Sequence, residues 1–113
     1  MPRNTLLSVP PYEVEQTLKH LGANLRTARL RRNLTIDAVA KKIGTGPRAV
    51  IDAEKGKPSA SVATFAGLLW AFDLLGQLDE VAEPERDREG SALARARERS
   101  RARPGRKSLD DDF

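Results

Sequence analysis

Hydrophobic residues recur at steps of three and four between residues 12 and 82, which is the spacing of amphipathic helices. The first apolar stripe extends to about Arg32 and consists of Val14, Leu18, Leu21, Leu25 and Ala28. Gly22 weakens this helix midway, so a break at that point is an open alternative. No stretch of the chain alternates convincingly with period two. The pattern therefore predicts an all-α fold.

Two short helices follow, and each has its own start signal. A helix over residues 35–43 is expected because Thr35 is a good N-cap and Gly44 a good left-handed C-cap. Its inward positions are Val39, Ala40 and Ile43. A helix over residues 47–55 is expected because Gly46 can cap it and Pro47 takes the first helical position, where proline is favoured.

The remaining helices complete a small core. Ser61 is a suitable cap for a fourth helix, whose packing residues are predicted to be Val62, Phe65, Ala66, Leu69 and Phe72. A shorter fifth helix is expected over residues 76–82. Residues 12–82 are thus predicted to form one compact domain of four to five helices.

The two flanking segments have a different character. Residues 1–11 end in Pro10 and Pro11, which cannot continue a helix, so an extended arm is predicted. Residues 83–113 are rich in charge, and arginine occupies every second position from 95 to 103. We expect this basic tail to be disordered when free. Two roles remain open for it: a solubilising linker, or a segment that binds DNA or a protein, with Phe113 as an apolar anchor.

Composition excludes several classes of function. The chain of 113 residues has no cysteine and a single histidine, His20, so no thiolate or histidine metal site is expected. No catalytic triad or phosphate-binding glycine loop is present, and we predict neither enzymatic activity nor a cofactor. No apolar run reaches membrane-spanning length, and the first residues lack the apolar stretch of a signal peptide. The expected location is cytoplasmic, and the net charge of +4 favours polyanionic partners.

The helices over 35–43 and 47–55 are joined by a glycine-containing turn of about three residues. This spacing is typical of a helix-turn-helix, whose second helix lies in the major groove of DNA. An ordinary hairpin of two helices has the same spacing, so the spacing alone leaves both interpretations open.

Residues 21–72 resemble the lambda-repressor-like helix-turn-helix domain of the XRE family of regulators. The resemblance rests on four pieces in order: "R…RR-x-L-T", "A-x-K-I-G", "R-x-V-x-x-x-E-x-G" and an apolar fourth helix. The stretch "VATFAGLLWAFDLLGQLDEVAEPERDREG" is most similar to that of HipB-type antitoxins, whose partners are HipA-type kinase toxins. The resemblance implies a sequence-specific transcriptional repressor of this kind.

The resemblance also assigns roles to particular positions. The implied base-reading residues are Gly46, Pro47, Arg48, Ile51 and Asp52. Arginine binds guanine through two hydrogen bonds, aspartate accepts from cytosine N4, and isoleucine can contact a thymine methyl group. The implied contacts to the DNA backbone are Thr35, Thr45, Lys55, Lys57 and Arg29. Independently of the resemblance, Glu54 lies beside the inward Val50 and Ala53, and it is expected to pair locally with an arginine such as Arg29 or Arg32.

Two positions depart from the family pattern. Ile36 stands where the family often has glutamine, which removes one contact to phosphate or base. Asp52 stands where a basic or amide residue is common, and its charge would repel phosphate. Both departures concern which residues read the bases.

The partners expected are double-stranded DNA with an inverted-repeat operator, a second copy of the chain, and a HipA-like toxin kinase. The predicted dimer or partner surface consists of Leu68, Trp70, Leu74, Leu75 and Leu78. Two alternatives remain: a free-standing XRE-type repressor without a toxin, and an adaptor whose helical domain binds protein.

Overall fold

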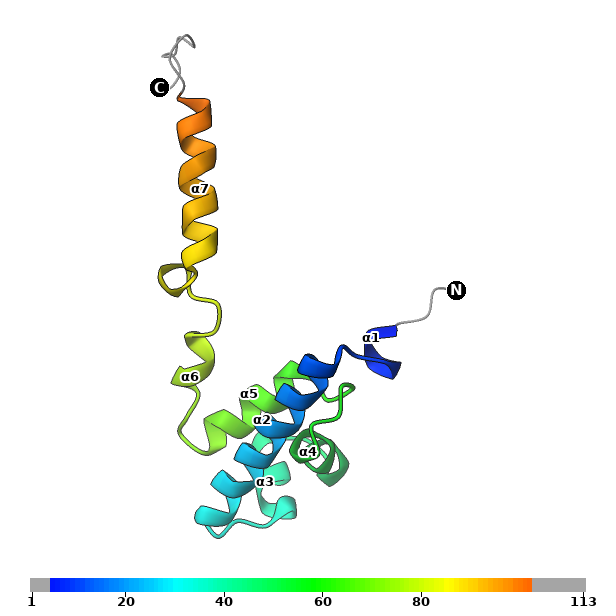
Figure 1. Ribbon diagram of the computed structural model, residues 1–113. Coiled ribbons are helices and arrows are strands. Elements are labelled where there is room, and N and C mark those ends of the chain that lie inside the picture. The colour runs from blue at the N-terminus through cyan, green and yellow to red at the C-terminus, as the bar shows by residue number, and fades with distance from the viewer. Residues whose placement is uncertain (1–4, 103–113) are drawn as a thin grey trace. The chain divides into compact units, whose positions relative to one another are not determined.

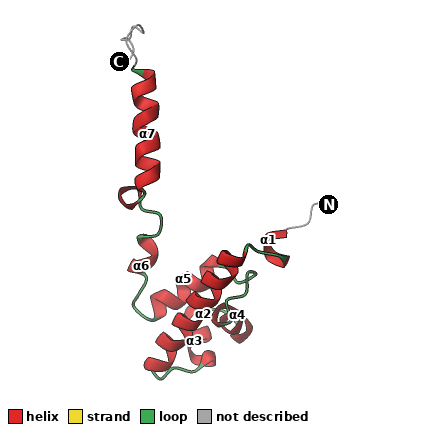
Figure 2. Cartoon of the chain, in the orientation of Figure 1, coloured by secondary structure: helices red, strands yellow, loops and turns green. Residues whose placement is uncertain are grey.

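The computed structural model describes residues 5–102, and within them it contains only helices and loops (Figures 1 and 2). This confirms the all-α prediction. The chain divides into two compact units, Met1–Leu78 and Asp79–Phe113. The first unit contains α1 (Thr5–Ser8), α2 (Tyr12–Arg31), α3 (Ile36–Ile43), α4 (Pro47–Glu54) and α5 (Val62–Ala71). The short helix α6 (Gly76–Asp79) spans the boundary, and the second unit holds the 3-10 turn η1 (Pro84–Arg86) and α7 (Arg88–Arg101).

The predicted caps are present at the ends of the short helices. The Thr35 hydroxyl accepts a hydrogen bond from the Ala38 amide at 3.0 Å, and the Ser61 hydroxyl accepts one from the Thr64 amide at 3.1 Å. Gly44 ends α3 in the left-handed conformation with φ of 81°. Each cap satisfies backbone groups that a helix end leaves unpaired, so the boundaries of α3 and α5 follow from local sequence.

The core of the first unit is built by α2, α3, α4 and α5. Its buried hydrophobic residues are Leu25, Val39, Ala40, Val50, Ala53, Phe65, Leu68, Leu69 and Phe72. Two predictions for α5 are wrong: Val62 is 72% exposed rather than packed, and Leu68 is fully buried rather than on a dimer surface. Because α5 is apolar on nearly all sides, its sequence does not reveal which side faces the core.

Two glycines allow the end of α4 to approach α2 closely. Gly22 lies within an unbroken α2, and a Cβ placed there would stand 2.5 Å from the Glu54 carbonyl oxygen. Gly56 follows α4 with φ of 70°, and a Cβ there would meet the backbone of Leu18 and Lys19. The break considered at Gly22 is therefore absent, because this glycine serves helix packing instead.

Both flanking segments are more helical than predicted. Thr5–Ser8 forms one turn of helix in place of an extended arm, closed by a hydrogen bond from the Val9 amide to the Thr5 carbonyl. Arg88–Arg101 forms α7 in place of a disordered tail, since its side chains are mostly good helix formers and Asp87 caps it. The predictions for residues 1–4 and 103–113, including Phe113, lie outside the described residues. Within residues 5–102, no helix combines the length and apolar character that a membrane crossing requires.

Candidate nucleic-acid interface

The turn between α3 and α4 is thin and internally bonded. The Thr45 amide donates to the Ala40 carbonyl at 2.9 Å, which fixes the turn against the end of α3. Gly46 occupies the N-cap position of α4, and a Cβ there would meet nothing within 4 Å. The turn therefore leaves open space in front of the first residues of α4.

The N-terminal end of α4 is exposed to solvent. Pro47 takes the first helical position as predicted, and both Pro47 and Arg48 are exposed. Within the described residues, the Arg48 guanidinium makes no ion pair or hydrogen bond. The first amides of a helix carry partial positive charge, and Gly46 offers no side chain to satisfy them. This end of α4 thus combines unsatisfied donors with an unpaired arginine.

The C-terminal end of α4 is held by a buried ion pair with α2. Arg29 Nε donates to Glu54 Oε2 at 2.6 Å, and Arg29 Nη2 donates to Glu54 Oε1 at 3.1 Å. Arg29 Nη1 also donates to the Leu34 carbonyl at 2.8 Å. The hydrogen bond to Glu54 raises the pKa of Arg29 above its ordinary value, so the guanidinium remains charged. Glu54 therefore pairs with Arg29 rather than Arg32, which donates instead to the Phe72 carbonyl.

Burial of this ion pair corrects the prediction that Arg29 contacts the DNA backbone. The side chains of Arg29 and Glu54 are only 8% and 6% exposed. With its donors directed to Glu54 and Leu34, Arg29 fixes the packing of α2 on α4 and does not present its charge to a phosphate.

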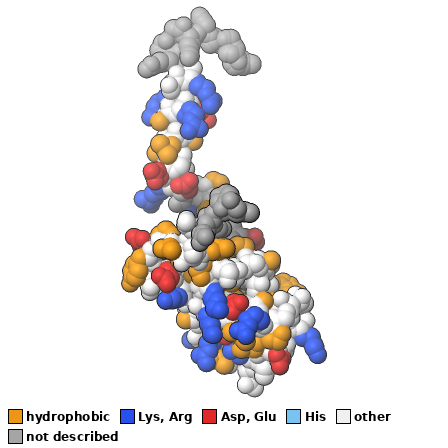
Figure 3. Space-filling view, turned by 90° about the vertical axis from the view of Figure 1, so that its right-hand side faces the viewer, with side chains coloured by type: hydrophobic (Ala, Val, Ile, Leu, Met, Phe, Trp, Pro, Cys, Tyr) orange, Lys and Arg blue, Asp and Glu red, His pale blue; other side chains and the backbone are white. Residues whose placement is uncertain are grey.

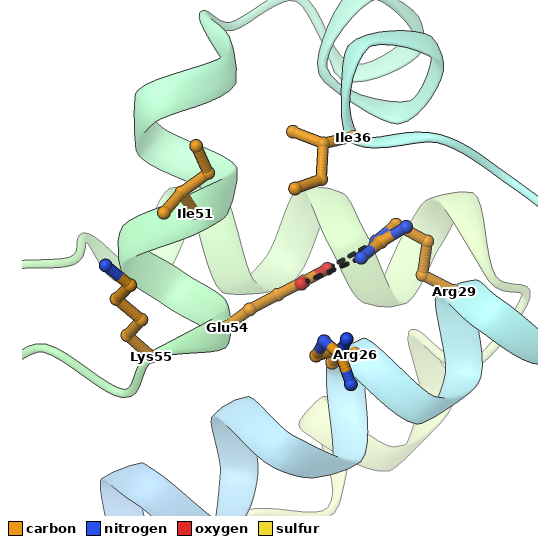
Figure 4. A pocket seen from close by; sticks show the side chains of 6 residues that line it. All are labelled: Arg26, Arg29, Ile36, Ile51, Glu54 and Lys55. Carbon is orange, nitrogen blue, oxygen red and sulfur yellow. Dashed lines mark hydrogen bonds and ion pairs between the residues drawn. The ribbon is translucent and has the colours of Figure 1, made fainter.

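An open cleft of about 260 Å³ lies beside the ion pair, between α2, the start of α3 and α4. Figure 4 shows Ile36 and Ile51 on one side of it, with Arg26 and Lys55 coming from α2 and the end of α4. Arg26 and Lys55 are exposed, and the two isoleucines are partly buried. The cleft thus combines an apolar wall with two cationic side chains at its edge.

Arg26 is the cationic residue of this cleft that is not among the individually predicted DNA contacts. It lies three residues before Arg29 on α2, and residues with this spacing share one face of a helix. Once Arg29 is paired with Glu54, the same spacing places Arg26 beside the end of α4. The sequence predicts that Glu54 pairs with an arginine, so the spacing of Arg26 and Arg29 is the pattern that indicates a position for Arg26 near α4.

Asp52 and Lys57 are paired with each other. The Lys57 ammonium lies 3.4 Å from Asp52 Oδ1, and their side chains are 49% and 22% exposed. Asp52 Oδ1 itself is shielded from solvent and makes no hydrogen bond within the described residues. The Asp52 carboxylate is therefore turned toward the loop after α4, and not toward the exposed end where Arg48 lies.

The other predicted backbone contacts stand at the two helix starts and near the end of α4. Thr35 is exposed while it caps α3, and Thr45 is partly buried in the turn. Lys55 and Lys57 are exposed. Figure 3 shows that several Lys and Arg side chains gather on one face of the helical domain, with hydrophobic side chains among them.

Only part of the predicted dimer surface is exposed to solvent. Trp70 is 54% exposed and Leu75 is 38% exposed, whereas Leu74 and Leu78 are partly buried against the core. The Lys42 ammonium lies 5.8 Å from the centroid of the Trp70 ring, which is within the range of a cation–π contact. Trp70 and Leu75 are thus the large apolar side chains of this set that solvent reaches.

Comparison with known protein families agrees with this geometry. Residues 25–73 match the family model for a helix-turn-helix. The match begins in the second half of α2 and ends two residues after α5. It therefore covers α3, α4 and the turn between them. It supports the XRE-like resemblance and a DNA-binding transcription regulator, and this family is not one of enzymes. No curated protein and no solved structure matches the chain.

Proposed function

We propose that the protein is a sequence-specific repressor that binds its operator with α4 in the major groove. The observation that supports this most is the exposed N-terminal end of α4, where Arg48 has no partner within the described residues. An arginine at this place can bind guanine O6 and N7 through two hydrogen bonds. Gly46 leaves the space that close approach to the duplex needs.

The cleft beside α4 gives this interface its second part. Ile51 lies on the same helix as Arg48, and its apolar side chain can contact a thymine methyl group. Arg26 and Lys55 then stand at the edge of the groove and neutralise phosphates. In this arrangement Arg48 specifies sequence, whereas Lys55 contributes affinity that is independent of sequence.

The test compares these two roles in matched variants. A preferred duplex is first selected from a pool of random sequences, and its affinity is measured beside that of a scrambled duplex. Arg48→Ala is expected to weaken binding to the selected duplex by about 1 to 3 kcal/mol and to relax specificity at one base pair. Lys55→Ala removes the same charge, but it should weaken both duplexes equally and reduce the salt dependence. Unchanged binding of the selected duplex by Arg48→Ala would place α4 outside the groove.

The proposed repressor is a homodimer whose contact includes Trp70 and Leu75. Exposed apolar side chains on the last core helix and the turn after it support this proposal. A two-fold dimer presents two recognition helices about 34 Å apart, so the operator should be an inverted repeat. Sedimentation should give a dimer for the natural chain and a monomer for Trp70→Glu. A natural chain that sediments as a monomer contradicts the proposal.

The finer proposal is that this repressor is the HipB-like antitoxin of a cytoplasmic HipA-like kinase toxin. It rests on the resemblance of residues 62–90 and on the family match for the DNA-binding part. The adjacent gene should then encode a kinase-like protein, and the two purified proteins should form one complex on operator DNA. A free-standing repressor would have no such neighbour and would repress its promoter without a partner.

A further inference from the structure

Helix α7 displays its side chains without a core of its own. None of its residues from Arg88 to Arg101 is buried. Its start is fixed locally, because the Asp87 carboxylate accepts a hydrogen bond from the Gly90 amide at 2.9 Å. A helix that is polar all round is stabilised by its local pairs or by what it binds.

Three arginines of α7 fall on one face. Arg88, Arg95 and Arg99 stand at positions i, i+7 and i+11 of the helix. At about 100° per residue, their directions differ by no more than roughly 40°. The first and last of them are about 16 Å apart along the helix axis. We name Arg88, Arg95 and Arg99 the arginine face of α7.

The arginine face is not neutralised within the described residues. No ion pair or hydrogen bond there involves the guanidinium of Arg88, Arg95 or Arg99. Arg86, just before α7, is different: it lies 3.4 Å from a Glu80 carboxylate oxygen and 3.8 Å from one of Glu83. Like charges four residues apart, as at Arg95 and Arg99, destabilise an isolated helix. This arrangement becomes favourable when an anionic surface lies along that face.

We propose that the arginine face of α7 binds the phosphate backbone of duplex DNA. The proposal rests on the proposed DNA-binding function and gives the second unit a part in it. A length of about 16 Å of duplex carries roughly ten phosphates, so each arginine has phosphates within its reach. Arginine also suits phosphate through its planar, bidentate donors.

A membrane surface fits this helix less well. Binding in a membrane interface requires a broad apolar face opposite the charged one. Leu93 is the one large apolar residue of α7, and its neighbours on that side are small or charged. Binding to the backbone of duplex DNA, by contrast, depends on neutralising phosphate charges and does not require an apolar face.

The test measures DNA affinity as a function of salt for the full chain. The triple variant Arg88→Gln, Arg95→Gln, Arg99→Gln should bind the selected and the scrambled duplex more weakly by the same factor. Its slope of log affinity against log salt should be smaller in magnitude by about 2.7, at roughly 0.9 per phosphate contact. The defect at 50 mM salt should therefore exceed the defect at 200 mM salt by about 40-fold.

Two matched single variants distinguish the effect of position on the helix from the effect of losing one positive charge. Arg95→Gln and Arg97→Gln remove the same charge from the same helix, but Arg97 points to the opposite side. Arg95→Gln should lower the slope by about one contact, while Arg97→Gln leaves it nearly unchanged. Lysine at all three positions should restore most of the slope. Helix content by circular dichroism checks that each variant keeps α7.

The outcomes distinguish this proposal from the one it rests on. An unchanged slope in the triple variant, in a protein whose operator binding still depends on Arg48, overturns the role of α7 alone. Equal effects of Arg95→Gln and Arg97→Gln also overturn it, because DNA affinity would then not depend on which side of α7 carries the arginine. Loss of binding to anionic vesicles without loss of DNA binding assigns the face to a membrane and overturns it. A natural chain that binds no DNA overturns both proposals.

Discussion

The two ends of α4 differ in how firmly they are held by the rest of the domain. At its C-terminal end, the Glu54 side chain is 6% exposed and joined to Arg29, and Gly22 lets the backbones of α2 and α4 approach each other. At its N-terminal end, Gly46, Pro47 and Arg48 are all exposed. One end of a helix of eight residues is therefore anchored while the other is open.

In the proposed complex with DNA, this difference separates stability from recognition within one short helix. Substitutions at the anchored end should change the free energy of unfolding and leave the sequence preference in DNA binding intact. Substitutions at the open end should do the reverse, because their side chains contribute little to the core. The anchored end thus holds the open end in position, and each can be tested without the other.

The largest effect is expected from removing the acidic partner of the buried ion pair. Glu54→Ala leaves the Arg29 guanidinium buried without its counter-charge, which costs about 3 to 5 kcal/mol of stability. Urea unfolding followed by circular dichroism measures this loss. Glu15→Ala is the matched control, because it removes an ion pair at the surface: the Glu15 side chain is 41% exposed and that of its partner Lys19 is 57% exposed. This variant should change stability by under about 0.5 kcal/mol.

A double substitution sharpens this result. Arg29→Met with Glu54→Leu replaces the pair by apolar side chains of similar size and should recover most of the stability that Glu54→Ala loses. It still loses the hydrogen bond from Arg29 to the Leu34 carbonyl, which is worth about 1 kcal/mol. Equal stability of Glu54→Ala and the natural chain would show that the anchored end does not depend on this pair.

The second effect concerns the close approach of the two backbones. Gly22→Ala places a Cβ 2.5 Å from the Glu54 carbonyl oxygen and 2.6 Å from that of Ala53. Because backbone atoms yield little, the strain should cost about 1 to 3 kcal/mol, despite the better helix propensity of alanine. Gly76→Ala adds the same methyl group at the start of α6, where nothing lies within 4 Å, and should leave the thermal midpoint unchanged or slightly raised. A stabilised Gly22→Ala protein would mean that α2 and α4 are not this close.

The sequence predicted those features of the fold that depend on neighbouring residues. The caps Thr35, Gly44 and Ser61 satisfy backbone groups within their own helices, so local sequence is sufficient to identify them. One distant contact was predicted as well: the pair of Glu54 with an arginine, because a carboxylate beside inward Val50 and Ala53 needs a counter-charge.

Several features that depend on distant contacts were not predicted correctly. Gly22 suggested a break in the first helix, because the α4 backbone that it contacts is more than thirty residues away in sequence. Leu68 was placed on the surface because α5 is apolar on several sides. Arg29 was assigned to phosphate and to Glu54 at once, and burial decides between them. For α7, the scarcity of apolar residues hid the helix that local propensity and the Asp87 cap allow.

The smallest effect on stability is expected at Asp52, midway between the two ends. Asp52→Asn keeps the shape of the side chain and removes its charge beside Lys57. Both side chains of this pair are partly exposed, so stability should change by under about 1 kcal/mol. DNA affinity should rise roughly two- to tenfold, because one negative charge near the phosphates is lost and Lys57 is released. The salt slope should grow in magnitude by up to about 0.9.

The change at Asp52 also decides whether this residue reads a base. Asp73→Asn serves as the control, since it makes the same change at an exposed position after α5. If Asp52 is held by Lys57 in the DNA complex as it is here, Asp52→Asn tightens binding to selected and scrambled duplexes alike. If the carboxylate instead turns to accept a hydrogen bond from cytosine N4, the variant should bind the selected duplex more weakly and the scrambled one more tightly. The second result would extend the open end of α4 by one turn, and it would show that the ion pair with Lys57 breaks on binding.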